Sequence, residues 1–373
     1  MKIGIDISLL AGSWDGIGHY IHNVLVYMNK QNNEDVFYLY SDKPITKELG
    51  LNSNFVIRDG DGRGNHVLWL LTKLPKIMKD DSLDVFWQPD FLLPISPKTV
   101  KTVVTVHDMS AYAYSEYAPT RTNITHKLFL KPTCKKADVI LTISQNCKQE
   151  LMKYMSVDER KITTIYNGCK MFPNGMNATD DEVNAYLQKL GVEKKQFLLF
   201  VGTLSPRKNA DVLVKAFLEY KRLGGKKKLV LAGNIADKSQ NVRDIINQSV
   251  FKDSVVIAGY ISDLEKRVLY YNAAMLLYPS RLEGFGFPML EAMQAQIPVI
   301  TSNCSCMPEI AQKGAVYLNN IDSYEELCAH IFEVESMNHE QMKQLLNIGM
   351  ERVEFFEGIN FQKLTYDCIR NVL

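Results

Sequence analysis

The residues best suited to chemistry lie in one stretch, residues 279–293, which reads PSRLEGFGFPMLEAM and stands between a strand-like apolar run and a helical pattern. Gly284 and Gly286 let backbone amides approach a ligand closely, and amides at a helix N-terminus favour an anion such as phosphate. Glu291 can accept hydrogen bonds from vicinal hydroxyls, while Glu283 lies in the loop itself. We therefore predict a phosphate- and hydroxyl-binding site, although Glu291 taken alone also fits a carboxylate that stabilises the helix dipole.

A second motif follows another apolar run, where the sequence reads GTLSPRKN. Arg207 and Lys208 stand side by side just past the expected strand, and an Arg fork with a Lys point charge can hold a diphosphate. Asn209 is of the type expected at a helix N-cap. A solvated basic turn explains most Arg-Lys pairs, but this pair lies at the sheet edge where α/β proteins bind ligands.

Two shorter motifs follow strands of the first half. Gly16 and Gly18 lie in GIGHY, between the first expected strand and the first expected helix, where a tight turn alone would also explain them. His107 follows the apolar run TVVTV and precedes Asp108. For His107 the pattern supports a structural role and a role in chemistry about equally.

The composition excludes several classes of protein. Lys and Arg total 43 against 42 Asp and Glu, so the net charge of +1 disfavours a nucleic-acid binder. The seven cysteines have no zinc-type spacing, which indicates reduced thiols in a cytoplasmic protein. Neither a signal peptide nor an apolar run of membrane-spanning length is present.

Common cofactor motifs are also missing. The sequence contains no G-x-x-x-x-G-K-[ST] and no GxGxxG at the first helix, so neither a P-loop nor a nicotinamide cofactor is expected. The run DGDG at residues 59–62 looks like a metal motif but lacks the further carboxylates of a calcium loop. We expect a mobile loop there and no metal.

The elements that must position these motifs alternate between short β-branched runs and longer helical patterns, which predicts parallel α/β sheets. A length of 373 residues favours two domains. We expect strands at Lys2–Ile7, Val36–Tyr40, Asp84–Gln88, Thr102–His107, Asp138–Ser144, Lys161–Tyr166, Phe197–Gly202, Lys228–Ala232, Val255–Gly259, Ala274–Tyr278, Pro298–Thr301 and Ala315–Leu318. The polar, turn-rich stretch after Asn167 predicts the linker.

With these motifs in this order, the sequence resembles the retaining nucleotide-sugar glycosyltransferases of family 4 over nearly its whole length. The resemblance rests on GIGHY, TVHD, ADVILTIS, FVGTLSPRKN, LVLAG, VVIAGYIS and PSRLEGFGFPMLEAM…IPVITSNCSCMPEI. It implies the α/β GT-B fold, in which two Rossmann-like, doubly wound parallel-sheet domains face a central cleft. Residues 1–170 would bind the acceptor, 171–194 link the domains, 195–352 bind the nucleotide sugar, and 353–373 form a helix returning to the first domain.

The resemblance also implies roles for individual residues. Glu291 would hold the ribose, Glu283 the donor sugar, and Arg207 with Lys208 the diphosphate. The further residues that would contact the donor are Gly16, Gly18, His107, Tyr260, Ile261, Phe285, Gly286 and Phe287. Some members carry an Arg after the glycine where this chain has Thr203, which leaves more of the diphosphate to Arg207 and Lys208.

The reaction implied is transfer of a hexose with retention, in which a departing phosphate oxygen takes the acceptor's proton, His107 orients the sugar and no metal is required. The donor is expected to be GDP-mannose or a UDP-sugar, with mannose favoured, and the acceptor a glycan or lipid-linked glycan of polysaccharide or lipopolysaccharide synthesis. A sugar-nucleotide epimerase and a non-catalytic partner subunit remain as alternatives. The sequence does not indicate an oligomeric state.

Two stretches of the first half could meet the inner face of the cell membrane. The first, residues 66–79, contains Pro75 and is expected to be an ordinary core-packed helix. The second, Arg121–Lys136, carries five basic side chains. Basic amphipathic segments bind anionic lipids, and a core-packed helix with a solvated face explains this pattern equally well.

Overall fold

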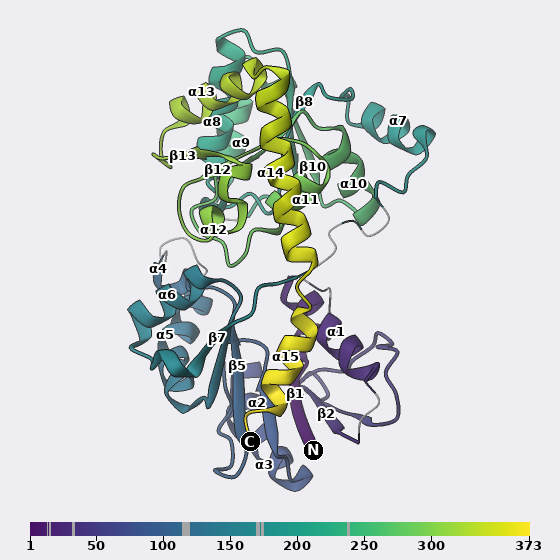
Figure 1. The fold of residues 1–373 in the computed structure, drawn as a ribbon, viewed down its shortest axis with the longest axis vertical. Helices are drawn as coiled ribbons and strands as arrows, with labels where there is room; N and C mark the ends of the chain where they lie inside the picture. Colours follow the sequence, from purple (N-terminus) through teal and green to yellow (C-terminus); the bar gives the residue numbers. More distant parts are fainter. Residues whose placement is uncertain are drawn as a thin grey trace. The chain divides into compact units, whose positions relative to one another are not determined.

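The computed structural model describes residues 1–373 apart from 13, 15, 32–33, 114–119, 169–171, 173–174 and 237–238, and apart from the side chains of residues 120–123. The chain divides into two compact units (Figure 1). Unit 1 comprises Met1–Gly168 and Ile359–Leu373, and unit 2 comprises Cys169–Gly358. The cleft expected between the two domains stays a prediction.

Unit 1 is built on a 7-stranded parallel sheet of order β3-β2-β1-β4-β5-β6-β7. Its strands are β1 (Lys2–Asp6), β2 (Val36–Ser41), β3 (Phe55–Asp59), β4 (Val85–Gln88), β5 (Lys101–Val106), β6 (Val139–Thr142) and β7 (Ile162–Thr164). Its helices are α1 (Gly16–Asn29), α2 (His66–Thr72), α3 (Leu74–Asp81), α4 (Ser110–Ala113), α5 (Thr120–Lys136), α6 (Gln145–Met155) and α15 (Phe361–Arg370).

Helices cover both faces of this sheet because its strands are apolar on both faces. Trp87 packs in the cluster that includes α1 and α15, while its neighbour Phe86 packs in the cluster that includes α2 and α3. The chain order places β1 beside both β2 and β4, so the strand order reverses there. Open α/β sheets bind ligands at the carboxyl ends of the strands at such a switch point.

Unit 2 is built on a 6-stranded parallel sheet of order β10-β9-β8-β11-β12-β13. Its strands are β8 (Phe197–Val201), β9 (Lys228–Ala232), β10 (Val255–Gly259), β11 (Met275–Tyr278), β12 (Val299–Ser302) and β13 (Val316–Leu318). Its helices are α7 (Asp180–Lys189), α8 (Ala210–Arg222), α9 (Gln240–Asn247), α10 (Asp263–Asn272), α11 (Phe287–Gln294), α12 (Met307–Ala311), α13 (Tyr324–Ser336) and α14 (His339–Glu357). The switch point lies between β8 and β11.

Three segments differ in the structure from what the sequence predicts. The stretch expected as a linker at 171–194 contains α7, because Thr179 and Glu182 form a reciprocal capping box at its start. The tail expected to return from 353 instead stays in unit 2 as α14 and re-enters unit 1 at Ile359. There Asn360 caps α15, which lies beside α1 (Figure 1) and shares a core cluster with it. The basic stretch at 66–79 forms α2 and α3, which Pro75 separates by starting the second helix.

Candidate functional site

A cluster of three charged side chains of unit 2 lies just after β8 and β11, at its switch point. Arg207 and Lys208 end the short 3₁₀ helix Pro206–Lys208 that follows β8, and Glu283 lies in the loop after β11. The Lys208 Nζ is 2.6 Å from one Glu283 carboxylate oxygen, and the Arg207 Nη1 is 3.5 Å from the other. The structure therefore joins residues that the sequence places in two separate motifs.

Neighbouring groups hold this cluster in place. The Lys208 Nζ also donates to the Tyr278 hydroxyl at 2.7 Å, and the Arg207 Nη1 donates to the Leu282 carbonyl at 3.1 Å. The Ser305 side chain accepts from the Glu283 backbone N–H and donates to the Glu283 carbonyl. The two loops are thus fixed to each other before any ligand arrives.

Burial and mutual charge set the ionisation of the cluster. Burial alone would raise the pKa of Glu283, but the charges of Lys208 and Arg207 outweigh it and lower that pKa. Burial lowers the pKa of Lys208, and Glu283 offsets only part of this effect. Two cations face one carboxylate, so the cluster has a surplus positive charge for an anion.

Glu291 belongs to a second ion pair. It is 8% exposed on α11, and its Oε1 lies 2.8 Å from the Nζ of Lys266 on α10. The carboxylate of Glu291 raises the pKa of Lys266 against the effect of burial. Because α11 begins at Phe287, Glu291 lies at the start of the second turn and faces Lys266.

The loop before α11 has the backbone that its glycines allow. Gly286 is the N-cap residue with φ +91°, and a Cβ there would lie 2.7 Å from the end of Met289. Pro288 follows in the first turn, where proline is well tolerated, and Phe285 is buried. Phe287 starts the helix, so its amide is one of those left without an intrahelical partner.

Asn209 is the N-cap residue of α8, as the sequence predicted, but its side chain makes no capping hydrogen bond. Its amide donates to the Ile321 carbonyl at 2.6 Å, and its oxygen accepts from Arg281 at 2.8 Å. Asn209 itself has φ +58°, a conformation that asparagine tolerates well. It therefore anchors the turn that carries Arg207 and Lys208 rather than the helix.

Tyr260 and Ile261 lie outside the charged cluster. They follow β10, which is separated from β8 by β9 in the sheet. Tyr260 is 86% exposed. Both residues share the carboxyl edge of the sheet with the cluster, and their predicted contact with a nucleotide base stays a prediction.

The other predicted residues belong to unit 1. Gly16 and Gly18 lie within the first turn of α1 and not in a loop before it, because the helix begins at Gly16. His107 follows β5, with Nε2 2.8 Å from the Pro89 carbonyl and its ring edge-on to Tyr20 at 5.2 Å between centroids. These contacts fix the orientation of the ring, and the role of His107 toward a substrate stays a prediction.

A polar group that the motif analysis missed lies at the carboxyl ends of β1, β2 and β4. Asp6 ends β1, Gln88 ends β4, and Asp42, His66 and Asp90 stand in the segments that follow β2, β3 and β4. The signal was present in the sequence, since KIGID and VFWQ are apolar strands that each end on a polar residue. We call these five residues the unit 1 edge cluster.

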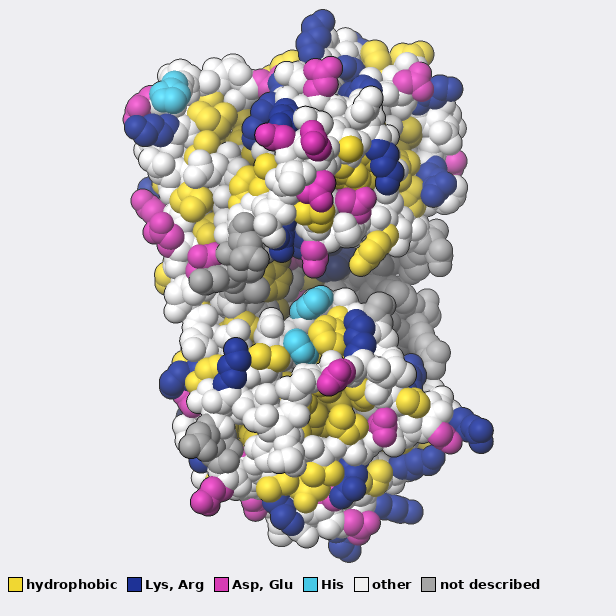
Figure 2. Space-filling view, turned by 90° about the vertical axis from the view of Figure 1, so that its right-hand side faces the viewer, with side chains coloured by type: hydrophobic (Ala, Val, Ile, Leu, Met, Phe, Trp, Pro, Cys, Tyr) yellow, Lys and Arg dark blue, Asp and Glu magenta, His cyan; other side chains and the backbone are white. Residues whose placement is uncertain are grey.

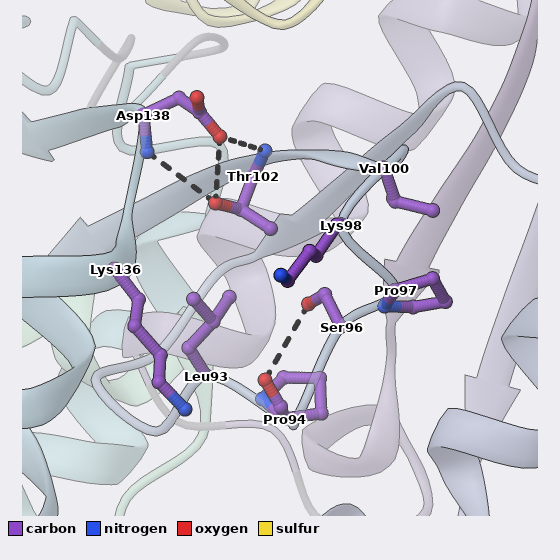
Figure 3. A pocket seen from close by; sticks show the side chains of 9 residues that line it. All are labelled: Leu93, Pro94, Ser96, Pro97, Lys98, Val100, Thr102, Lys136 and Asp138. Atoms are coloured by element: carbon purple, nitrogen blue, oxygen red, sulfur yellow. Dashed lines mark hydrogen bonds between the residues drawn. The ribbon is translucent and has the colours of Figure 1, made fainter.

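A charge-lined pocket of unit 1 lies at the opposite edge of its sheet, where β5 and β6 begin (Figure 3). This cavity of about 480 Å³ is lined by Leu93, Pro94, Lys98, Val100, Lys136 and Asp138. Asp138 accepts hydrogen bonds from the Thr102 backbone and hydroxyl, which ties the starts of the two strands together. Because ligands of α/β sheets bind at the carboxyl edge, this pocket is not the candidate site.

Three further features of the described residues do not point to another site. Within the described ranges, no group of three or more His, Cys, Asp or Glu side chains is placed to hold a metal ion. None of the helices described is long and apolar enough to cross a bilayer. Figure 2 shows basic and acidic side chains interspersed on the face it draws.

Comparison with known proteins matches each half of the chain to a family. The profile described as Glycosyltransferase Family 4 matches residues 14–170, and that described as Glycosyl transferases group 1 matches residues 183–349. The chain is 30% identical to the O-antigen chain mannosyltransferase RfbU of Salmonella typhimurium over 59% of this chain and 57% of RfbU. It is 27% identical to the O-antigen chain mannosyltransferase B of Escherichia coli over 77% of this chain and 74% of that protein.

Among solved structures, Anabaena HepE in complex with UDP and glucose is similar with a TM-score of 0.74. The match covers 99% of both chains at 15% identity. At this identity the likeness concerns the fold, and it agrees with the pair of Rossmann-like α/β domains predicted from the sequence.

Proposed function

Because the chain belongs to the glycosyltransferases that join a family 4 domain to a group 1 domain, we propose that it transfers a hexose, with retention, from a nucleoside-diphosphate sugar to a glycan. The observation that carries this proposal is the cluster of Arg207, Lys208 and Glu283 at the switch point of unit 2. It offers fixed cations where a diphosphate leaving group gains charge. One such preorganised donor contributes about 2.7–4 kcal/mol to transition-state stabilisation.

The hydrogen-bond inventory of Lys208 fits this role. An ammonium group has three donors, and Glu283 and Tyr278 accept two of them. The third is available for a phosphate oxygen, with Arg207 beside it as a planar fork. Glu283 then keeps Lys208 in position and reaches the donor sugar from the same loop.

Glu291 would bind the ribose through its second carboxylate oxygen. Lys266 occupies Oε1, which leaves Oε2 for a vicinal hydroxyl. The amides of Phe285, Gly286 and Phe287 would meet the sugar or the phosphates from the N-terminus of α11. The protein cations would replace a metal at the diphosphate.

The identity of the sugar is taken from the relatives. Two curated relatives are named O-antigen chain mannosyltransferases, so we propose mannose from GDP-mannose and an acceptor in O-antigen or related lipopolysaccharide synthesis. HepE, similar in fold, is named in complex with UDP and glucose, so a UDP-sugar is the second donor to assay. In the reaction, a phosphate oxygen of the leaving group would take the acceptor's proton while His107 orients the sugar.

Peripheral contact with the inner face of the membrane is part of the proposal through α5. Its described exposed face carries Ile124 and the 61% exposed Leu128 beside Lys127 and Lys131. Arg121, which the sequence also assigned to this face, has a side chain outside the described residues. Apolar and basic side chains on one exposed face suit an anionic bilayer.

The test of the proposed function is a transfer assay on purified protein with GDP-mannose, UDP-glucose and other nucleotide sugars, with product stereochemistry read by NMR. We expect transfer with retention from one donor and its loss in Glu291→Ala and Lys208→Ala. Unchanged transfer by both variants would refute the site. Interconversion of the donor sugar without an acceptor would instead identify an epimerase, and donor binding without any turnover a non-catalytic subunit.

For α5, we expect the wild type to sediment with vesicles containing phosphatidylglycerol and the variant Leu128→Gln/Lys131→Gln to remain in solution. The matched control is Leu264→Gln on α10, which is also an exposed leucine. Equal sedimentation of wild type and variant would exclude contact through this face.

A further inference from the structure

The unit 1 edge cluster lies at the second switch point of the molecule, between β1 and β4. Gln88 donates from its amide nitrogen to Asp6 Oδ2 at 3.1 Å, so the ends of these two strands are bridged by side chains. Asp6 Oδ1 accepts from the hydroxyl and backbone N–H of Ser8. Strand order reverses here, as it does at the charged cluster of unit 2. The fold therefore provides a second ligand-binding edge with its own chemistry.

Two buried atoms of this cluster, Gln88 Oε1 and His66 Nδ1, have no hydrogen-bond partner among the described residues. Gln88 is 2% exposed, and with its amide nitrogen on Asp6, its carbonyl oxygen Oε1 makes no hydrogen bond to the described residues. Leaving a buried acceptor unpaired is costly, so such groups normally pair with a ligand or an ordered water. Gln88 Oε1 thus marks a place where a donor group is expected.

The remaining members bring carboxylates to the same edge. His66 Nδ1 lies 3.3 Å from Asp42 Oδ2; burial lowers the pKa of His66, but the nearby Asp42 and Asp6 carboxylates outweigh it and raise that pKa. The charges of Asp6 and His66 act on the Asp90 carboxyl in opposite directions, since Asp6 raises its pKa and His66 lowers it. Burial, aided by the Asp6 carboxylate, raises the pKa of Asp90 to about 6.

Resting on the proposed function, we propose that the unit 1 edge cluster binds the accepting sugar and selects a neutral saccharide, one that carries neither phosphate nor carboxylate on that sugar. Three carboxylates and an amide oxygen are acceptors for sugar hydroxyls. His66 is the only one of the five residues that can carry a positive charge, and Asp42 already lies beside it. An anionic sugar would meet uncompensated like charge, whereas hydroxyls supply the donors that Gln88 Oε1 and the aspartates need.

The test measures binding directly, so that it does not depend on turnover. Ligand-observed NMR titrations would use mannobiose, other neutral disaccharides and mannose 6-phosphate on the full chain. We expect a neutral disaccharide to bind at least tenfold more tightly than mannose 6-phosphate, and Asp90→Asn to weaken that binding at least tenfold. The control Asp80→Asn removes the same charge from an exposed position on α3 and is expected to bind like the wild type.

Thermal unfolding of Asp90→Asn shows whether this variant is folded. A second variant, Gln88→Glu, adds charge without changing the size of the side chain and is also expected to lose sugar binding. Equal binding of mannose 6-phosphate, no binding of any neutral disaccharide, or unchanged binding by Asp90→Asn would each overturn the proposal. Sugar binding that depends on Asp90 in a protein with no transferase activity would refute the proposed function and leave this site standing. Sugar transfer that is unchanged in Asp90→Asn would refute this acceptor site and leave the proposed function standing.

Discussion

At the scale of the residue, the ion pair between Lys208 and Glu283 serves both stability and binding. Lys208→Met leaves the buried Glu283 carboxylate without its closest cation, which costs about 3–5 kcal/mol of unfolding free energy. It also removes a donor to the diphosphate, so we expect kcat to fall about a hundredfold or more. Denaturant unfolding and a transfer assay measure the two effects.

The double variant Lys208→Met/Glu283→Gln separates the effect on stability from the effect on activity. With the stranded charge removed, part of the stability returns, whereas activity stays low because the diphosphate still lacks its cation. The control Lys215→Met removes a half-exposed lysine of α8 and is expected to change neither the free energy of unfolding nor the transfer activity. Recovery of activity in the double variant would contradict a direct role for Lys208.

The raised pKa of Asp90 predicts that the free energy of unfolding depends on pH. This pKa of about 6 exceeds the ordinary value, so the folded protein binds a proton that the unfolded chain releases between about pH 4 and 6. Stability contributed by the protonated form is therefore lost as pH rises through 6. Asp90→Asn is expected to be more stable than the wild type by about 1–2 kcal/mol at pH 7.5 and equal to it at pH 4, as measured by urea unfolding. A constant difference across this range would show that Asp90 titrates normally.

At the scale of the element, the start of α11 depends on a glycine. Gly286→Ala forces φ +91° on a residue with a Cβ, which costs about 1 kcal/mol, while Met289 can move its flexible end aside. The same substitution shifts the amides that would meet the donor, so we expect the donor KM to rise about tenfold.

Gly224→Ala is the matched control, because Gly224 has φ +96° and open space around its Cβ position in a turn away from the cluster. It is expected to lose similar stability and to keep the donor KM. If both variants shift the donor KM equally, the amides before α11 do not contact the donor.

Periodicity predicted most of these elements because buried parallel strands are continuous apolar runs. The strands at Lys228–Ala232 and Val255–Gly259 have the predicted bounds. β3 was missed because it is an edge strand whose apolar run is only three residues long and is followed by the exposed Arg58 and Asp59. α7 was missed because its capping box lies in a polar stretch. The motifs of Arg207, Lys208 and Glu283 could be read from the sequence, but their contact could not, since strand order brings together residues 75 positions apart.

The partners of the site were not predictable for a related reason. Lys266 is one of many helix lysines, and only its approach to Glu291 from another helix distinguishes it. Gln88 and Asp90 lack a motif, and only the neighbouring end of β1 gives them a common site with Asp6. The class of enzyme and the fold were predicted because they depend on local strings, and the network around the site was not, because it depends on topology.

At the scale of the whole molecule, the chain crosses between its units twice, and the last segment completes the core of the first unit. Phe361 of α15 is buried and stacks on Tyr20 at 5.4 Å between centroids, and the Tyr366 hydroxyl donates to Asp35 at 2.6 Å. Tyr20 in turn contacts the His107 ring. The C-terminal helix therefore supports the α1 side of unit 1 and, through Tyr20, the orientation of His107.

We expect Phe361→Ala to destabilise unit 1 by about 3–5 kcal/mol, because it opens a cavity between α15 and α1. Hydrogen exchange should then accelerate in peptides of β1 and α1 and remain unchanged in unit 2, whose core lacks α15. A nucleotide that binds unit 2 should still raise its unfolding temperature, since binding stabilises only the unit that binds. Leu364→Ala on the same helix is half-exposed and is expected to leave unit 1 unaffected. Loss of nucleotide binding in Phe361→Ala would instead mean that the two units unfold as one and that the tail stabilises the donor site as well.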